Sequence, residues 1–444
     1  MKNLTNKILL SLFFLCFAGT AKSQATFSLL DAIEIALKNN FQIEIAKKEI
    51  EQNVNSNTIG NAGALPRLDL RVSQNQTFQE QNNPNSVLQG TIFTANTSPT
   101  LELQWEIFNG FLAKANKQIF DKMVDLSLNN EQLVIQNTIH SVSLAYFQCI
   151  LEKDKLDVFR STLTFSADKK RRAVFRYELG NYSSIESKQA VSNYYTDSIN
   201  YINQLQIVGN ATRNLNRLLQ VDLEKQHVFP NSFPKLDISI NKDSVMANYI
   251  QNIDLKSILI NEQILAGQLK ATKSNLYPTL TTNLGYNLNS TYVNSDFFTG
   301  TAPLSWQGYF NFTLNFNLFN GGKTRIAIKN AQTDLEINKL NERDLGLSVK
   351  NKILNQYYQY ENLVTLIDIQ KKMLAINRSQ LEQAEQKADL GTINTFDLRE
   401  VQLSLLKNEL NLLINQFNLI QTYLELEKLQ GILNLEKIVS LVEN

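Results

Sequence analysis

Residues 309–320 read YFNFTLNFNLFN and are followed by Gly321. From Phe310 to Leu318 every second residue is apolar, and the residues between them are Asn or Thr. This period of two predicts a β-strand with one apolar and one polar face. A run of about 9 to 11 alternating residues is also long enough for a tilted strand to cross a bilayer in a closed barrel. A soluble sheet with one face on a core would show the same pattern.

The end of this stretch occurs twice in the chain, and so do features on both sides of it. Three landmarks recur in the same order: Pro66 at Pro278, Phe108-Asn109-Gly110 at Phe319-Asn320-Gly321, and Leu179-Gly180 at Leu390-Gly391. The offset is 212 residues for the prolines (278 minus 66) and 211 for the first pair of glycines (321 minus 110). Landmarks that keep this spacing indicate that one supersecondary unit was duplicated.

Three other segments alternate as residues 309–320 do, so each unit is expected to contribute two strands. Their outward positions are Leu68, Leu70 and Val72; Leu101, Leu103, Trp105 and Ile107; and Leu280, Thr282, Leu284, Tyr286 and Leu288. Polar neighbours such as Glu102, Gln104 and Glu106 would face inward. The polar connections between paired strands, at about 80–98 and 290–305, are predicted to be solvent-exposed loops.

Long helices follow the strands in each unit. Residues 111–179 contain no proline and no glycine, so a continuous helix there would be about 105 Å long. Its counterpart runs from Lys323 to about Asp389, and each is followed by a turn and a returning helix. The last helix has two rows of apolar residues every seven positions: Leu398, Leu405, Leu412, Leu419 and Leu426, and Leu403, Leu410, Phe417 and Leu424. Such rows indicate coiled-coil packing, either in a closed wall or in a solid bundle.

The duplication predicts a division of the chain into segments. The first unit is expected at 24–222, with strands at about 66–80 and 99–109 and a helical hairpin at about 111–222. The second is expected at 244–431, with strands at about 278–290 and 306–320 and a hairpin at about 323–431. Residues 223–243, which contain Pro230 and Pro234, would form a linker and equatorial region, and residues 432–444 a short tail.

The first residues have the pattern of a secretory signal peptide. Lys2 and Lys7 precede an apolar run at 8–18, and small residues at Ala21 and Ser23 offer a cleavage site, so we expect residues 1–23 to be removed. That removal leaves 40 basic and 42 acidic residues (43 minus 3 against 42), which gives no indication of a nucleic-acid partner. Beyond this segment no apolar run reaches about 18 residues, so any membrane crossing would be made by strands.

The order of these features resembles the TolC family of outer membrane factors. An N-terminal helix containing Ala36-Leu37-Lys38-Asn39-Asn40 leads to a strand that follows a proline and a second strand that ends in Phe-Asn-Gly. A long helix, a Leu-Gly turn and a return helix complete each unit. The resemblance covers nearly all of the mature chain, and its specificity comes from order, spacing and duplication together.

The resemblance implies a mixed α and β membrane protein that works as a homotrimer. Four strands per chain would close a twelve-stranded β-barrel in outer membrane lipid, and the helices would continue it as a twelve-helix α-barrel tunnel across the periplasm. The strand count agrees, because four strands alone would leave open edges in lipid that only an oligomer can remove. Pro66, Gly110, Pro278 and Gly321 would mark the transitions between helices and strands.

The implied function is passive exit of substrates, in multidrug or small-molecule efflux, that an inner membrane pump and a periplasmic adaptor deliver. The pump would be of the resistance-nodulation-division or ABC type. Type I protein secretion and metal-ion efflux are alternatives, and a non-conducting envelope scaffold is an alternative of another class. An enzyme is not expected, because the sequence has no nucleophile motif, and neither His140 nor His227 has neighbours at metal-ligand spacing. No cofactor or bound metal is predicted.

The tips of the two hairpins are the first candidate site. Their glycines can adopt the left-handed conformation that ends one helix before the next begins, which is also what an ordinary interhelical turn needs. The resemblance implies that the tips dock the adaptor. The candidate residues are Arg176, Leu179, Gly180, Asn181, Tyr182 and Ser183 at the first tip, and Lys387, Leu390, Gly391, Thr392, Ile393 and Asn394 at the second. The second tip has Lys387 and Asp389 where the family pattern has an arginine.

Asp397 and Glu400 are the second candidate site, as a periplasmic gate. They follow Gly391 by six and nine residues, where TolC-like channels have acidic constriction residues, and their spacing of three puts them on one helical face. In a trimer they would form a ring of carboxylates that attracts cations. The alternative is that they only complement the positive end of the returning helix. The first unit has Glu186 and Gln189 at the equivalent positions.

Overall fold

The structure is a computed structural model, and it describes residues 26–83, 85, 90–180, 183–230, 233, 240–295 and 299–431. The predicted signal peptide, the tail at 432–444, Asn181, Tyr182 and most of 231–239 lie outside the described residues. The chain divides into two compact units, each described by itself. Unit 1 comprises Met1–Ile43, Val134–Asn252 and Val349–Asn444, and unit 2 comprises Glu44–Leu133 and Ile253–Ser348.

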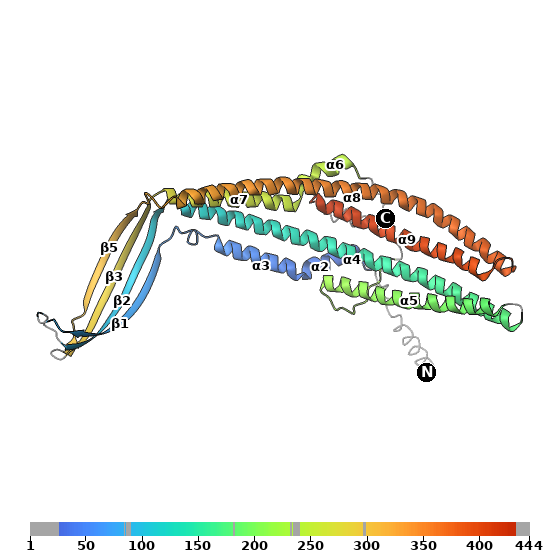
Figure 1. Cartoon of the computed structure of the whole chain (residues 1–444), viewed down its shortest axis with the longest axis horizontal. Helices are drawn as coiled ribbons and strands as arrows, with labels where there is room; N and C mark the ends of the chain where they lie inside the picture. The colour runs from blue at the N-terminus through green and yellow to red at the C-terminus, as the bar shows by residue number, and fades with distance from the viewer. Residues whose placement is uncertain are drawn as a thin grey trace, which may run out of the picture. The chain divides into compact units, whose positions relative to one another are not determined.

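Unit 2 contains an antiparallel sheet. Its strands are β1 (Arg67–Gln81), β2 (Gly90–Asn109), β3 (Thr279–Asn294), β4 (Thr299–Thr301) and β5 (Ser305–Asn315). The strands pair in the order β1-β2-β3, and both β4 and β5 pair with the remaining edge of β3 (Figure 1). Strands from the two sequence repeats therefore meet at the β2–β3 pair, where Leu103 lies opposite Leu284.

Strands β2, β3 and β5 differ in length from the prediction. The predicted loop at about 80–98 is wrong for residues 90–98, because they continue the ladder as far as the Gln81–Gly90 pair. These residues are mostly small and polar, and backbone pairing with β1 rather than apolar alternation makes them a strand. The predicted loop at about 290–305 is also wrong for residues 290–294, which continue β3, and for residues 299–301, which form β4. β5 ends at Asn315 rather than at 320. Asn315 pairs with Thr279, the first residue of β3, and the described residues offer no further strand to pair with 316–320.

The sheet has one apolar face that is exposed to solvent in the single chain. One row across the four long strands consists of Leu68, Leu103, Leu284 and Phe310, and the adjacent row on the other face consists of Asp69, Glu102, Gly285 and Tyr309. Leu68, Leu70, Phe310 and Phe312 are all at least 60% exposed. At the far end of the apolar face, Phe78 and Phe93 pack with ring centroids 4.7 Å apart.

The helices repeat the duplication closely. The long helices α4 (Leu112–Glu178) and α8 (Lys323–Asp389) both have 67 residues, and the return helices α5 (Ser184–Leu219) and α9 (Thr395–Leu429) have 36 and 35. Shorter helices precede the strands: α2 (Leu29–Asn39) and α3 (Phe41–Ser56) in the first repeat, and α6 (Lys242–Ala247), η1 (Asn248–Gln251), α7 (Ile253–Lys273) and η2 (Ser274–Leu276) in the second.

The main apolar core of unit 1 joins α2, α4, α5 and α9. Tyr146, Phe147 and Ile150 of α4 are fully buried there, together with Leu219 of α5 and Tyr423 of α9. The Tyr146 hydroxyl donates to the Phe27 carbonyl at 2.8 Å, which fixes the start of the described chain to this core. Cys149 lies in the same core, and burial raises the pKa of its thiol to about 12, so the thiol stays protonated and serves as an apolar packing group.

Both histidines contact other residues of unit 1. The His227 ring stacks on Phe27 with centroids 4.1 Å apart, its Nε2 lies 2.7 Å from Asn216 Oδ1, and burial lowers its pKa. His140 lies 3.1 Å from the Glu425 carboxylate. Within the part of the chain that the structure describes, no three His, Cys, Asp or Glu side chains are grouped as a metal site needs. None of the described helices has a segment long and apolar enough to cross a membrane.

Candidate functional site

The first hairpin tip ends α4 at Glu178 and begins α5 at Ser184. Gly180 has a φ of +75°, and its N–H donates to the Tyr177 carbonyl at 2.9 Å. Ser183 then caps α5 in a reciprocal arrangement: its hydroxyl oxygen accepts from the Glu186 N–H, and the Glu186 carboxylate accepts from the Ser183 N–H and hydroxyl. This capping box satisfies the free donors at the start of α5 and fixes where the chain reverses.

The second tip reverses the chain by a complete Schellman motif. Gly391 has the same φ of +75°, its N–H donates to the Ala388 carbonyl at 3.2 Å, and the Thr392 N–H donates to the Lys387 carbonyl at 2.9 Å. Leu390 and Leu179 occupy equivalent places in the two turns, and their side chains are 79% and 59% exposed. Each tip therefore presents a large apolar side chain to solvent next to the glycine that ends the long helix.

Ion pairs connect the two hairpins near their tips. Lys169 and Arg172 of α4 lie 3.3 Å from Glu385 and 3.1 Å from Asp389 of α8, respectively. A small cavity beside these pairs is lined by Arg176, Ile393 and Leu398 among others. Arg176 has no ion-pair partner among the residues that the structure describes. Sequence reasoning selected Arg176 and Ile393 but missed the pairs, because the lysine–glutamate and arginine–aspartate partners lie more than 200 positions apart.

Asp397 and Glu400 lie on the first two turns of α9, and both are exposed. The Asp397 N–H donates to the side chain of the cap residue Asn394 at 2.8 Å. Neither carboxylate has a hydrogen-bond or ion-pair partner within the described residues. In the first repeat the equivalent Glu186 is engaged in its capping box, whereas Asp397 makes no such return contact. A capping role therefore accounts for Glu186 and leaves the Asp397 carboxylate available.

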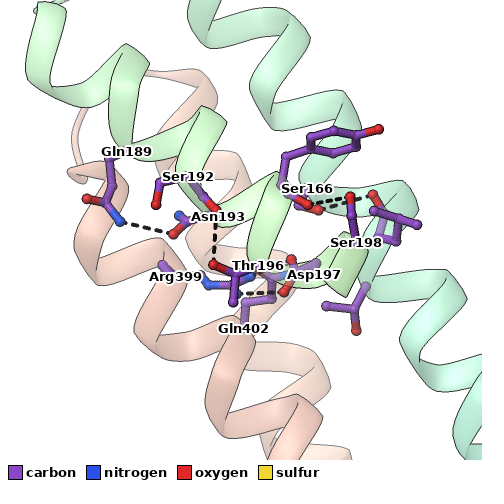
Figure 2. A network of polar contacts seen from close by, with 12 residues as sticks. Ser166, Gln189, Ser192, Asn193, Thr196, Asp197, Ser198, Arg399 and Gln402 are labelled. Atoms are coloured by element: carbon purple, nitrogen blue, oxygen red, sulfur yellow. Dashed lines mark hydrogen bonds and ion pairs between the residues drawn. The ribbon is translucent and has the colours of Figure 1, made fainter. Parts of the chain in front are cut away.

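Arg399, between these two acids in sequence, has a different environment. It makes a bidentate ion pair with Asp197 of α5, with Nη2–Oδ1 at 2.7 Å and Nη1–Oδ2 at 2.8 Å, and Nη1 also donates to Gln402 at 2.9 Å (Figure 2). The Asp197 side chain is 1% exposed. The sequence analysis missed this pair. A signal was available, because Arg399 begins a row of seven-residue spacing that continues as Leu406, Leu413 and Ile420.

The four transition residues lie in unit 2 and differ in their packing. Pro66 and Pro278 directly precede β1 and β3. Gly110 (φ +63°) is closely packed, since a Cβ there would come within 2.4 Å of the Ser274 carbonyl oxygen. A Cβ on Gly321 (φ +67°) would meet no atom of the described chain within 4 Å, apart from its own chain neighbours. Leu318 and Phe319 beside Gly321 are both 86% exposed.

A membrane-length sheet with an apolar outer face, joined to paired long helical hairpins, defines a class of outer membrane channel. The model of the outer membrane efflux protein family matches residues 32–220 and 249–432, so the chain belongs to that family. The protein is thus an outer membrane protein whose helical part extends into the periplasm. The family and the similar structures are channels rather than enzymes.

Solved structures of membrane proteins, among them an outer membrane channel, have the same fold. The CmeC channel of Campylobacter jejuni is 16% identical with a TM-score of 0.74, over 91% of this chain and 85% of that one. A membrane protein from Pseudomonas aeruginosa is 16% identical with a TM-score of 0.75, over 94% and 98%. VceC of Vibrio cholerae is 13% identical with a TM-score of 0.71, over 91% and 96%. No curated protein sequence matches the chain.

Proposed function

We propose that three copies of the chain assemble into a channel that gives substrates a passive exit through the outer membrane. The observation that carries this proposal is the sheet, whose four long strands have an exposed apolar face and whose open edges are β1 on one side and β4 with β5 on the other. Open edges cannot remain in lipid, because their unpaired N–H and C=O groups have no water to bond. Pairing the β4 and β5 side of one copy with β1 of the next closes these edges.

The rows of the sheet support this closure. Apolar side chains on one face suit lipid, and the aromatic pair Phe78–Phe93 lies at one end of that face, as the aromatic girdles of barrels do. The opposite face carries amides such as Asn283, Asn287 and Asn311 along β3 and β5. A lumen of mainly uncharged amide and hydroxyl groups suits the passage of varied solutes and supplies no energy of its own.

Energy and substrate choice then come from partners. We assign docking of a periplasmic adaptor to the hairpin tips, where Leu179 and Leu390 are exposed on fixed turns and Arg176 is free of ion pairs within the described residues. The adaptor would connect the channel to an inner membrane pump of the resistance-nodulation-division or ABC type. Exposed apolar side chains beside a free guanidinium are groups that a protein partner can bury.

The gate in this proposal consists of Asp397 and Glu400. Their carboxylates are exposed on one face of α9 and have no partner within the described residues, so in a trimer six of them surround the periplasmic opening. Carboxylates in such a ring repel one another and attract cations. A closed state would therefore pass little current and would be sensitive to divalent cations.

A cellular experiment tests the efflux function. Deleting the gene should raise the accumulation of a fluorescent cationic dye such as ethidium, and expression of the native chain should restore low accumulation. A Leu390→Asp chain, which places a charge at the exposed tip, should reach the outer membrane but fail to restore it. If deletion changes the retention of secreted proteins or metal ions but not of dyes, the conduit serves type I secretion or metal efflux instead.

A further inference from the structure

Residues 397–400 of α9, the proposed gate segment, contain three charged residues, but only two of them face solvent. Asp397 and Glu400 are exposed, whereas the Arg399 side chain is 13% exposed and lies against α5. Figure 2 shows Arg399 and Asp197 directed toward one another from α9 and α5, with Gln402 beside them. Nη1 and Nη2 of Arg399 each donate to a different carboxylate oxygen of Asp197.

Arg399 would change the gate if it were free. A guanidinium keeps its charge at any accessible pH, and its long side chain can reach over about one helical turn. Charges within one turn lie closer together than the Debye length of about 8 Å at physiological salt, so solvent ions do not screen them fully. Three free arginines next to six gate carboxylates would cancel up to half of their charge.

We propose that Asp197 is a positioning residue for the gate: it binds and neutralises Arg399, so that Asp397 and Glu400 remain uncompensated and face away from α5. This inference rests on the proposed function, because it requires that Asp397 and Glu400 line the opening. The substrate class that it favours is cationic, since the ring keeps its full negative charge.

The burial of the pair argues for this role over simple stabilisation. A buried ion pair adds little stability compared with apolar side chains of similar volume. The row that Arg399 begins continues with Leu406, Leu413 and Ile420, so an apolar residue would suit the position. The bidentate geometry instead fixes the rotation of α9 relative to α5, because a fork-to-carboxylate contact tolerates little change in direction.

The test is the reversal potential of the purified protein in a planar bilayer under a potassium chloride gradient. Asp197→Asn should lower the ratio of cation to anion permeability by about twofold or more, since it releases the charge of Arg399. Asp197→Asn/Arg399→Gln should return the ratio to the native value. Glu409→Gln is the matched control, because it breaks the ion pair of 3.0 Å between Arg378 of α8 and Glu409 of α9, which lies further along α9 from the gate, and it should leave the ratio unchanged.

Each outcome decides the inference. An unchanged ratio for conducting Asp197→Asn protein would overturn it, and so would a double variant that stays low, because the effect would then not come from the charge of Arg399. If Asp197→Asn does not assemble, Asp197→Ser, which leaves room for water, takes its place with the same expected ratio. If neither Asp197→Asn nor Asp197→Ser assembles while the double variant does, Asp197 has a structural role, and the inference is overturned. Absence of conductance from the native protein would contradict the proposed function instead.

Discussion

At the scale of single residues, the two halves of the duplicated unit use the same residue type under different constraints. Gly110 and Gly321 have nearly the same left-handed backbone, but only Gly110 is packed against another segment of its own chain. Both copies of the repeat therefore keep the left-handed backbone, which a glycine in the sequence can encode. The packing around each glycine depends instead on which segment lies next to it.

Replacing these glycines should give unequal losses of stability. Gly321→Ala should cost about 1 to 2 kcal/mol for the left-handed conformation. Gly110→Ala should cost about 1 to 3 kcal/mol more, because its Cβ would overlap the Ser274 carbonyl. Urea unfolding of the folded protein measures both. Equal small losses would contradict the packing at Gly110, and equal large losses would indicate that a neighbouring subunit packs against Gly321.

Asp154 of α4 should make stability depend on pH. Burial raises its pKa to about 7, against a lowering effect of Lys153, so between about pH 4 and pH 7 the folded state binds more protons than the unfolded state. Stability should therefore fall as the pH rises through this window and then level off. Asp154→Asn should remove that part of the fall and stabilise the protein at pH 8, by less than the full pKa difference implies, because solvent screens a carboxylate that is only partly buried.

The check is the unfolding midpoint of both proteins at pH 5 and pH 8. The substitution should stabilise the protein less at pH 5, near the start of that window, than at pH 8, above its end. A stabilisation of equal size at both values would show that ionisation of Asp154 is not its cause.

At the scale of elements, the alternating pattern predicted the strands better than their ends. Alternation identifies a strand only where apolar and polar residues differ clearly, as in Phe310 to Leu314. Residues 90–98 become strand through pairing with β1, and the end of β5 depends on where β3 begins. Neither is a property of the segment's own sequence.

The two faces of β3 should tolerate charge differently. Leu284→Lys places a charge on the apolar face and should cost about 2 to 4 kcal/mol near the bilayer midplane or less near its edge. Asn283→Lys changes the adjacent residue, which lies on the polar face, and should be nearly neutral. The yield of heat-modifiable protein in outer membranes measures the difference. A larger loss for Asn283→Lys would show that the faces are assigned the wrong way round.

The candidate site shows a similar limit of sequence reasoning. The resemblance to TolC-like channels was needed to select Asp397 and Glu400 from their positions relative to Gly391. Their spacing shows only that they share one helical face, and their role as a gate stays a prediction. The Arg399–Asp197 pair joins residues 202 positions apart, and its only local signal is a charged residue in an otherwise apolar row. Contacts between helices of different hairpins depend on how the helices pack, which periodicity alone does not determine.

At the scale of the whole molecule, duplication and membership of the outer membrane efflux protein family define the architecture. Both sequence repeats contribute to one sheet, and each contributes one long hairpin of nearly equal length. The absence of a long apolar run after the first residues predicted that any membrane crossing would be made by strands. The proposed assembly of three copies and the proposed docking of partners at the tips would depend on surfaces that become complete only between chains.

Single-channel conductance in a planar bilayer tests the central claim most directly. The native protein should give small, stepwise conductance that divalent cations block, because the proposed ring of Asp397 and Glu400 would narrow the opening. Asp397→Ala/Glu400→Ala protein should give larger steps with weaker block, while Glu409→Gln protein behaves as the native chain does. Folded trimers that insert into the bilayer but never conduct, with or without the gate substitutions, would contradict the account of this protein as an exit channel.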